Sequence, residues 1–212
     1  DCLYFDGWKT AKQLTKKINE WCMKQGLEDG YSYELYKTYG TAIKGLLAEG
    51  HVENNEESID AFLQDVHDLP IHELLGPDPK LREIILSMDP SIPRYVFTAS
   101  VRDHAMRCLT ALGIADLFVD IIDCKKCDLE TKHSHHSFRV AMAVANVSDP
   151  ERCVFLDDSV KNISAARQIG WRSVLVGTIG RDCGSKISSE HAELEIDRIH
   201  GMADVLPELF LN

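Results

Sequence analysis

The chain has 212 residues and a formal net charge of −11; 44% of its residues are hydrophobic and 27% are charged. These values are typical of a globular protein with a buried core, and no apolar run reaches the roughly 20 residues that span a bilayer. An acidic chain is a poor match for nucleic-acid phosphates, so we expect neither nucleic-acid nor membrane binding. The seven cysteines are an odd number and scattered, which favours reduced thiols and a location in the cytoplasm or the nucleus.

The first part of the chain is expected to be helical. Seven irregular residues, 1–7, precede a block from 8 to 85 in which apolar residues recur at helical spacing. Three stretches carry this pattern, and each is expected to form one helix: 8–25, 31–49 and 56–66. No strand pattern occurs before about residue 93. We therefore expect residues 8–85 to form an all-helical block.

Residues 86–212 show an alternation of short apolar strands and helices. Strands are expected at 94–98, 117–122, 153–156 and 172–176, with a weaker one at 192–196. Helices are expected at 100–113, 134–146, 159–169 and 201–210. This alternation predicts an α/β fold, a doubly wound Rossmann-like parallel sheet with helices on both faces. Ligands of such sheets bind at the carboxyl ends of the strands.

Two adjacent carboxylates, Asp157 and Asp158, stand where an apolar strand ends and a helix begins. Neighbouring carboxylates repel unless a cation or hydrogen-bond donors compensate them, and Mg²⁺ prefers one or two carboxylates together with water and phosphate oxygens. The pair therefore indicates a magnesium site. The alternative is a helix N-cap, because an acid followed by Ser159 at a helix start is a common capping arrangement.

Thr98 and Lys132 are the residues that could bind an anion beside this pair. Thr98 ends a strand shortly before a helix, where a hydroxyl and free backbone N–H groups can hold a phosphate oxygen. Lys132 lies in a polar segment before another helix and could neutralise charge on a phosphoryl group. Each residue alone has a plainer interpretation: Thr98 as a turn or cap threonine, Lys132 as a solvated surface lysine.

Two further patterns have structural alternatives. Cys124 and Cys127, followed by three histidines between residues 133 and 136, resemble a zinc site, but a single cysteine pair without the usual histidine spacing favours two loop thiols. Tyr36 and Lys37 lie in the helical block, where aromatic residues at helical spacing usually pack in a core. If they face the acidic pair, they would instead contact a substrate.

Taken together, these residues resemble the haloacid dehalogenase superfamily of phosphohydrolases over nearly the whole chain. Three of its motifs match in order and spacing: Phe97-Thr98 is similar to the second, Lys132 to the third, and Leu-Asp-Asp-Ser-Val-Lys-Asn at 156–162 to the fourth. Residues 8–85 then correspond to the cap of the family. Within that block, Leu-Tyr-Lys-Thr-Tyr-Gly at 35–40 with Gly45-Leu46 is similar to the pyrimidine 5'-nucleotidase branch.

The resemblance implies a chemistry and a set of roles. The protein would be a magnesium-dependent phosphohydrolase whose partner is a small phosphorylated metabolite such as a nucleoside monophosphate. Asp158 would be the main metal ligand and Asp157 a second ligand or a support behind it. Thr98 and Lys132 would act in catalysis by stabilising phosphoryl charge, and the same two residues with Ala99, Tyr36 and Lys37 would bind substrate. In the family, one aspartate attacks phosphorus to form an aspartyl-phosphate, and a second acts as acid and base.

The chain departs from the family at its first motif. The pattern Asp-x-Asp-x-Thr-Leu-Tyr is matched only in its tail, Asp1-Cys2-Leu3-Tyr4, and Asp6 is out of register. The acid/base aspartate is expected immediately before Asp1 and the nucleophile two residues earlier, with the central strand that carries them. We therefore expect the intact parent to be a phosphatase and the chain as given to be inactive. The alternative is a natural shortened paralogue that binds phosphate, metal or a partner without catalysis.

Overall fold

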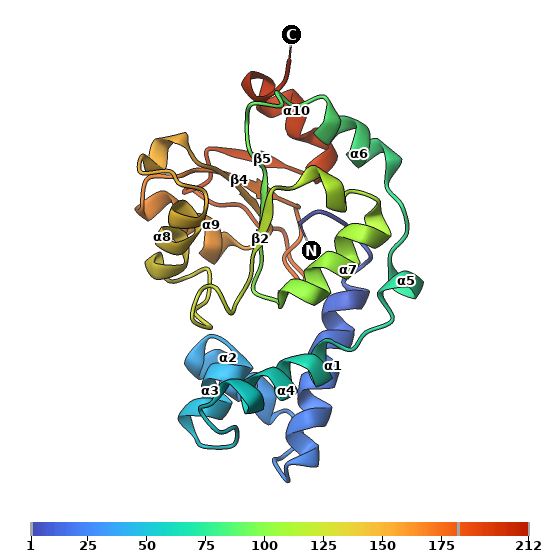
Figure 1. Ribbon diagram of the computed structural model, residues 1–212, viewed down its shortest axis with the longest axis vertical. Coiled ribbons are helices and arrows are strands. Elements are labelled where there is room, and N and C mark those ends of the chain that lie inside the picture. Colours follow the sequence, from blue (N-terminus) through green and yellow to red (C-terminus); the bar gives the residue numbers. More distant parts are fainter. Residues whose placement is uncertain (1, 182, 212) are drawn as a thin grey trace.

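A computed structural model describes residues 2–181 and 183–211 and shows a helical part beside an α/β part (Figure 1). The helical part lies at the bottom of Figure 1, and the chain enters it along α1 and leaves it after α4. Its four helices are α1 (Lys9–Lys24), α2 (Tyr31–Tyr39), α3 (Ala42–Ala48) and α4 (Glu56–His67). Their buried side chains, among them Leu35, Leu46 and Phe62, form one cluster, which Cys124 of the α/β part joins.

The stretch 31–49, expected as one helix, forms two. Gly40 adopts the left-handed conformation (φ 84°) and ends α2, and the extended Thr41 accepts the backbone N–H of Lys44 on its hydroxyl at 3.3 Å to cap α3. The turn folds α3 back onto α2. The two helices meet so closely at Gly45 that a Cβ there would lie 2.7 Å from Leu35 Cδ2.

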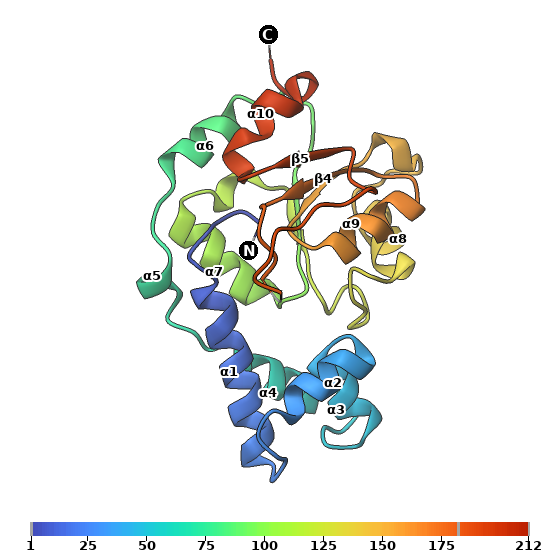
Figure 2. The same cartoon turned by 180° about the vertical axis from the view of Figure 1, so that it is seen from behind.

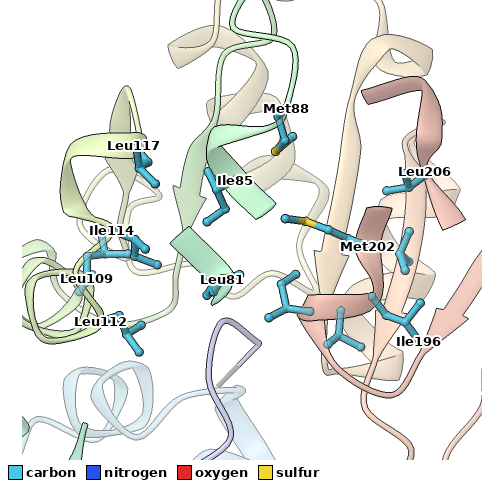
Figure 3. Close-up of a cluster of buried hydrophobic side chains, with 14 of the residues drawn as sticks. Leu81, Ile85, Met88, Leu109, Leu112, Ile114, Leu117, Ile196, Met202 and Leu206 are labelled. Atoms are coloured by element: carbon cyan, nitrogen blue, oxygen red, sulfur yellow. The ribbon is translucent and has the colours of Figure 1, made fainter. Parts of the chain in front are cut away.

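Two short helices, α5 (Ile71–Leu74) and α6 (Pro79–Leu86), lead from the helical part to the first strand. Leu81 and Ile85 of α6 are buried with Leu109 and Leu112 in a cluster of the α/β part (Figure 3). The expected block 8–85 therefore includes a helix that packs with the α/β part. Hydrophobic spacing alone could not assign α6, because an amphipathic helix does not specify which neighbour covers its apolar face.

The five strands in the described part of the chain pair in parallel, in two short sheets. One sheet has the order β1 (Tyr95–Phe97) and β2 (Asp120–Ile122), and the other the order β3 (Val154–Asp157), β4 (Arg172–Val176) and β5 (Leu194–Ile196). Among residues 2–181 and 183–211 no ladder joins β1 to β3. The helices that follow strands β1, β2, β3 and β5 are α7 (Arg102–Leu112), α8 (His135–Val144), α9 (Val160–Gln168) and α10 (Met202–Val205). Four 3₁₀ turns complete the fold: Ala115–Leu117, Pro150–Arg152, Ile199–Gly201 and Pro207–Leu209.

Helices cover both faces of the strands, and the two views agree on this arrangement (Figures 1 and 2). Helices α6, α7 and α10 pack on one face with Ile121 and Val174, while α8 and α9 pack on the other. The second face is aromatic: Phe138 makes edge-to-face contacts with Phe155 at 5.4 Å and Trp171 at 5.0 Å between ring centroids. Two covered faces explain why the strands read as continuous apolar runs rather than as alternating ones.

The end of the chain differs from expectation. A helix was expected over 201–210, but α10 ends at Val205 and a 3₁₀ turn follows from Pro207. Proline lacks the backbone N–H that would continue the helix, which explains the break. No helix in the described part of the chain is both long and apolar enough to cross a membrane.

Candidate active site

Asp157 is the last residue of β3, and its carboxylate is fully engaged by the protein. Oδ1 accepts the backbone N–H of Ser159 at 2.9 Å and the side-chain amide of Asn162 at 2.8 Å. Oδ2 accepts the Lys132 ammonium at 2.5 Å. The residue is only 2% exposed. Ser159, whose hydroxyl accepts the N–H of Asn162 at 3.4 Å, is the N-cap of α9, so Asp157 supports the helix start without being its cap.

Lys132 comes from the loop between β2 and α8 and ties two strand ends together. Its Nζ donates to the carbonyl of Phe97 at the end of β1, at 3.2 Å, as well as to Asp157 at the end of β3. The ammonium lies 5.5 Å from the ring centroids of both Phe97 and Phe155, within cation–π range. Its side chain is 14% exposed. Lys132 is therefore a held cation at the carboxyl ends of the strands, not a solvated surface lysine.

The ion pair fixes the charge state of both partners. Burial alone would lower the pKa of Lys132, but the Asp157 carboxylate outweighs it and the pKa is raised above its ordinary value. Burial would likewise raise the pKa of Asp157, but Lys132, with the hydrogen bonds from Asn162 and Ser159, holds it below its ordinary value. Both groups are therefore charged at neutral pH.

Asp158 is half-buried and differs from its neighbour in having no partner. Its carboxylate makes no hydrogen bond or ion pair to residues 2–181 or 183–211. It lines a cavity of about 640 Å³ between the N-terminal segment, the α5–α6 connection and the ends of β4 and β5. The described residues contain no group of three or more histidine, cysteine, aspartate or glutamate side chains placed to hold a metal. One free carboxylate beside a saturated one fits Mg²⁺, which keeps most of its ligands as water and phosphate oxygens.

Thr98 and Ala99 follow β1, directly beside the carbonyl that Lys132 binds. The Thr98 backbone N–H donates to Ile122 at 2.9 Å, and its hydroxyl accepts the N–H of Ser100 at 3.1 Å, which leaves the hydroxyl hydrogen available. Ala99 is exposed, and its backbone N–H has no partner within the described residues. Two donors therefore directly follow Phe97, the residue whose carbonyl binds Lys132.

The two expected cap residues do not join this group. Tyr36 stacks on Tyr33 with 6.3 Å between ring centroids, and Lys37 pairs with Glu34 at 3.1 Å and lies over the Tyr33 ring. Neither lines the cavity that reaches Asp158.

The ion pairs that join the cap to the α/β part were not predicted from the sequence. Lys44 of α3 pairs with Glu130 at 2.9 Å, and Lys125 pairs with Asp60 of α4 at 2.7 Å. No local pattern marks such a contact, because its partners are 86 and 65 residues apart in sequence.

The N-terminal segment lies at the same edge of the strands. The Cys2 thiol donates to the carbonyl of Leu156 at 3.4 Å. Asp6 accepts the backbone N–H and hydroxyl of Thr10 at 2.7 and 2.6 Å, so its carboxylate serves the start of α1. Asp1, which aligns with the first family motif, lies outside the described residues.

A model of the haloacid dehalogenase-like hydrolases matches residues 5–170 of the chain. The chain belongs to this family. Its parallel strands, flanking helices and helical cap confirm the fold that the sequence predicted.

The chain is also similar to individual proteins and solved structures. The chain is 28% identical over 196 residues to phosphate metabolism protein 8 of Saccharomyces cerevisiae, with 81% of this chain and 60% of that protein aligned. It thus spans about three-fifths of that relative's length. Among solved structures it is similar to CbbY from Rhodobacter sphaeroides in complex with phosphate (TM-score 0.65, 20% identity, 92% and 90% of the two chains). It is also similar to YfnB from Bacillus subtilis bound to magnesium (TM-score 0.55, 15% identity, 94% and 93%).

Proposed function

We propose that the intact protein is a magnesium-dependent phosphohydrolase acting on a small phosphomonoester such as a nucleoside monophosphate. The observation that carries the proposal is the position of Lys132, whose ammonium bridges the end of β1 and the Asp157 carboxylate at the end of β3. Thr98 and Ala99 directly follow Phe97, whose carbonyl accepts the Lys132 ammonium at 3.2 Å. The Lys132 ammonium, the Thr98 hydroxyl and the Ala99 N–H can bind the oxygens of a phosphoryl group at the carboxyl edge of a parallel sheet.

Asp158 is proposed as the main metal ligand and Asp157 as its support. Asp157 has both oxygens in use, so its contribution is to hold Lys132 and the start of α9 in place. When bound, Mg²⁺ would supply positive charge to a phosphoryl oxygen. The magnesium in the YfnB structure and the phosphate in the CbbY structure support this assignment by similarity of fold.

The proposal that the substrate is a nucleotide depends on one similarity in the cap. The stretch 35–40 with Gly45-Leu46 is similar to the pyrimidine 5'-nucleotidase branch, and it lies in α2 and α3 of the cap. We keep Tyr36 and Lys37 as proposed substrate contacts for a cap that has moved relative to the core, since Lys37 is about half exposed. Cap residues would then choose the leaving group while the core binds phosphate.

We propose that the acid/base aspartate is the residue before Asp1 and that the nucleophile lies two residues earlier. Among the described residues, Asp6 is the carboxylate of the N-terminal segment, and it is occupied by Thr10. We accordingly propose that residues 1–212 alone bind magnesium and phosphate without turnover.

A phosphatase assay on two chains tests the proposal. The 212-residue chain and a longer chain carrying an apolar strand and Asp-x-Asp before Asp1 are each given nucleoside 5'-monophosphates with and without Mg²⁺. We expect magnesium-dependent phosphate release from the longer chain only, and its loss in that chain's Asp158→Asn variant. Robust turnover by the 212-residue chain would contradict the placement of the nucleophile. No turnover by the longer chain would contradict the function and favour a binding paralogue.

A further inference from the structure

We propose that Lys44 of the cap and Glu130 of the core are positioning residues for Lys132. Their contact holds the loop that contains Lys132, so the cap fixes the position of the ammonium that would bind phosphate. This inference deepens the proposed function and rests on it for the role of Lys132. The loop spans residues 123–134, between β2 and α8, and is called the Lys132 loop below.

The Lys132 loop is shared between the two parts of the molecule. Cys124 is 7% exposed and belongs to the buried cluster of the cap helices, and Leu129 packs against that cluster as well. Cys127 is 1% exposed and is buried with Phe138 and Phe155 in the α/β part. The Cys-x-x-Cys pattern is therefore an anchor with one side chain in each part. Among the described residues, neither thiol belongs to a group of three or more side chains placed to hold a metal.

Ion pairs of opposite polarity add to these apolar contacts. A cap lysine, Lys44, meets the loop carboxylate of Glu130 at 2.9 Å, while a loop lysine, Lys125, meets the cap carboxylate of Asp60 at 2.7 Å. The cap backbone approaches at the same place, since a Cβ on Gly40 would lie 3.2 Å from Thr131 Cγ2. One pair has its lysine on the cap and the other has its lysine on the loop. This arrangement favours a single position of the cap against the loop, because a shift would bring like charges together.

The contact reaches Lys132 through two residues of ordered backbone. Glu130 donates its N–H to Cys127 at 2.8 Å, and the Thr131 carbonyl accepts the Ser134 N–H at 3.0 Å and the Ser137 hydroxyl at 2.9 Å. Lys132 follows directly, with its ammonium on Phe97 and Asp157. Because this segment is short and hydrogen-bonded, a displacement of Glu130 should also displace Lys132.

Breaking the pair should loosen Lys132 without unfolding the protein. Lys44 and Glu130 are each about one-third exposed, so loss of their attraction changes a local equilibrium by about two- to five-fold. A loosened Lys132 spends more time away from Asp157 and becomes more reactive towards an acylating reagent, because the contacts with Asp157 and the Phe97 carbonyl shield the amine.

The experiment measures the acetylation rate of Lys132 in the 212-residue chain by mass spectrometry, with exposed Lys80 as an internal reference. The variants are Lys44→Glu, Glu130→Lys and the exchanged pair carrying both changes. Lys16→Glu is the matched control, because Lys16 pairs at 3.5 Å with Glu20 inside α1 and its side chain is 75% exposed. We expect two- to five-fold faster labelling in each single variant, the wild-type rate in the control, and recovery in the exchanged pair.

Unchanged labelling in the single variants, or failure of the exchanged pair to recover, would overturn the inference. A purely structural effect of the substitutions would not be repaired by exchange. Protection of wild-type Lys132 by inorganic phosphate with Mg²⁺ is measured alongside. Absence of that protection would count against the proposed function, while the labelling pattern of the variants would still decide the coupling.

Discussion

The ammonium of Lys132 lies 2.5 Å from Asp157 Oδ2, in a pair whose side chains are 14% and 3% exposed. Two further hydrogen bonds satisfy the other carboxylate oxygen, so the charge of Asp157 is compensated on every side. Buried pairs of this kind contribute less by their attraction than by the cost of losing one partner. The pair therefore contributes to stability as well as to the proposed site.

Replacing Lys132 should destabilise the fold. Lys132→Met leaves Asp157 buried without its cation, and we expect the free energy of unfolding in urea at pH 7 to fall by about 3–5 kcal/mol.

The dependence of stability on pH should change in Lys132→Met as well. The raised pKa of Lys132 makes its contribution present below about 10.5 and lost as pH rises through the folded value. The lowered pKa of Asp157 makes its contribution present above about 3.8 and lost as pH falls. In Lys132→Met the first dependence should disappear and the second should weaken or reverse, because burial raises the pKa of Asp157 once its cation is gone; an unchanged stability profile would contradict the geometry of the pair.

The two adjacent carboxylates should respond oppositely to amidation. Asp158→Asn should change stability by less than about 0.5 kcal/mol, because Asp158 has no partner among the described residues. Asp157→Asn should cost several kcal/mol, on the order of a broken buried pair. Thermal unfolding with and without Mg²⁺ and phosphate should show stabilisation by these ligands in the wild type and none in Asp158→Asn. Ligand stabilisation that survives in Asp158→Asn would remove this residue from the metal site.

A buried histidine pair predicts acid sensitivity where the cap meets the core. His67 ends α4, and its ring centroid lies 5.1 Å from that of His104 on α7, whose Nδ1 is buried without a hydrogen-bond partner among residues 2–181 and 183–211. Burial lowers the pKa of both, that of His104 to about 4. The unfolded chain thus binds more protons, so stability should be full above about pH 6.5 and decline towards pH 4, by about 2–3 kcal/mol for His104.

His104→Leu should flatten the fall in urea midpoint between pH 7 and pH 4.5. His72→Leu, at a side chain 83% exposed, should leave the fall unchanged and is the matched control. An equally steep fall in His104→Leu would mean that other groups carry the acid response.

Gly45 should be required for the packing of α2 on α3. Alanine there gains helix propensity, but its Cβ would lie 2.8 Å from Leu35 Cβ and from Tyr39 Cδ2. We expect Gly45→Ala to destabilise the protein by about 1–3 kcal/mol in a urea titration. Gly76→Ala is the control, since nothing lies within 4 Å of its Cβ position. A Gly45→Ala variant as stable as Gly76→Ala would contradict the close approach.

The strands and the residues at their carboxyl ends could be predicted from local sequence. Parallel strands place their carboxyl ends at one edge, so residues that end strands, Thr98 and Asp157, are brought near each other by topology alone. Lys132 could be placed beside them only through the family resemblance, because a polar loop lysine has no local signature.

Contacts that depend on tertiary packing were not predictable. Gly40 and Thr41 break a helix that hydrophobic spacing joined, because a glycine in the left-handed conformation leaves the apolar period intact. Tyr36 and Lys37 were expected at the site but pack with Tyr33 and Glu34 on their own helix. Lys44 and Glu130 were missed since charged residues on exposed faces do not specify their partners.

Calorimetric titration of the 212-residue chain with inorganic phosphate, in Mg²⁺ and in a chelator, tests whether the chain holds a magnesium-dependent phosphate site. We expect phosphate binding that requires Mg²⁺ and is abolished in Asp158→Asn and in Lys132→Met, the latter judged under conditions where that variant is folded. Phosphate binding that is equally tight in the chelator, or unchanged in Asp158→Asn, would contradict a magnesium and phosphate site at the ends of β1 and β3.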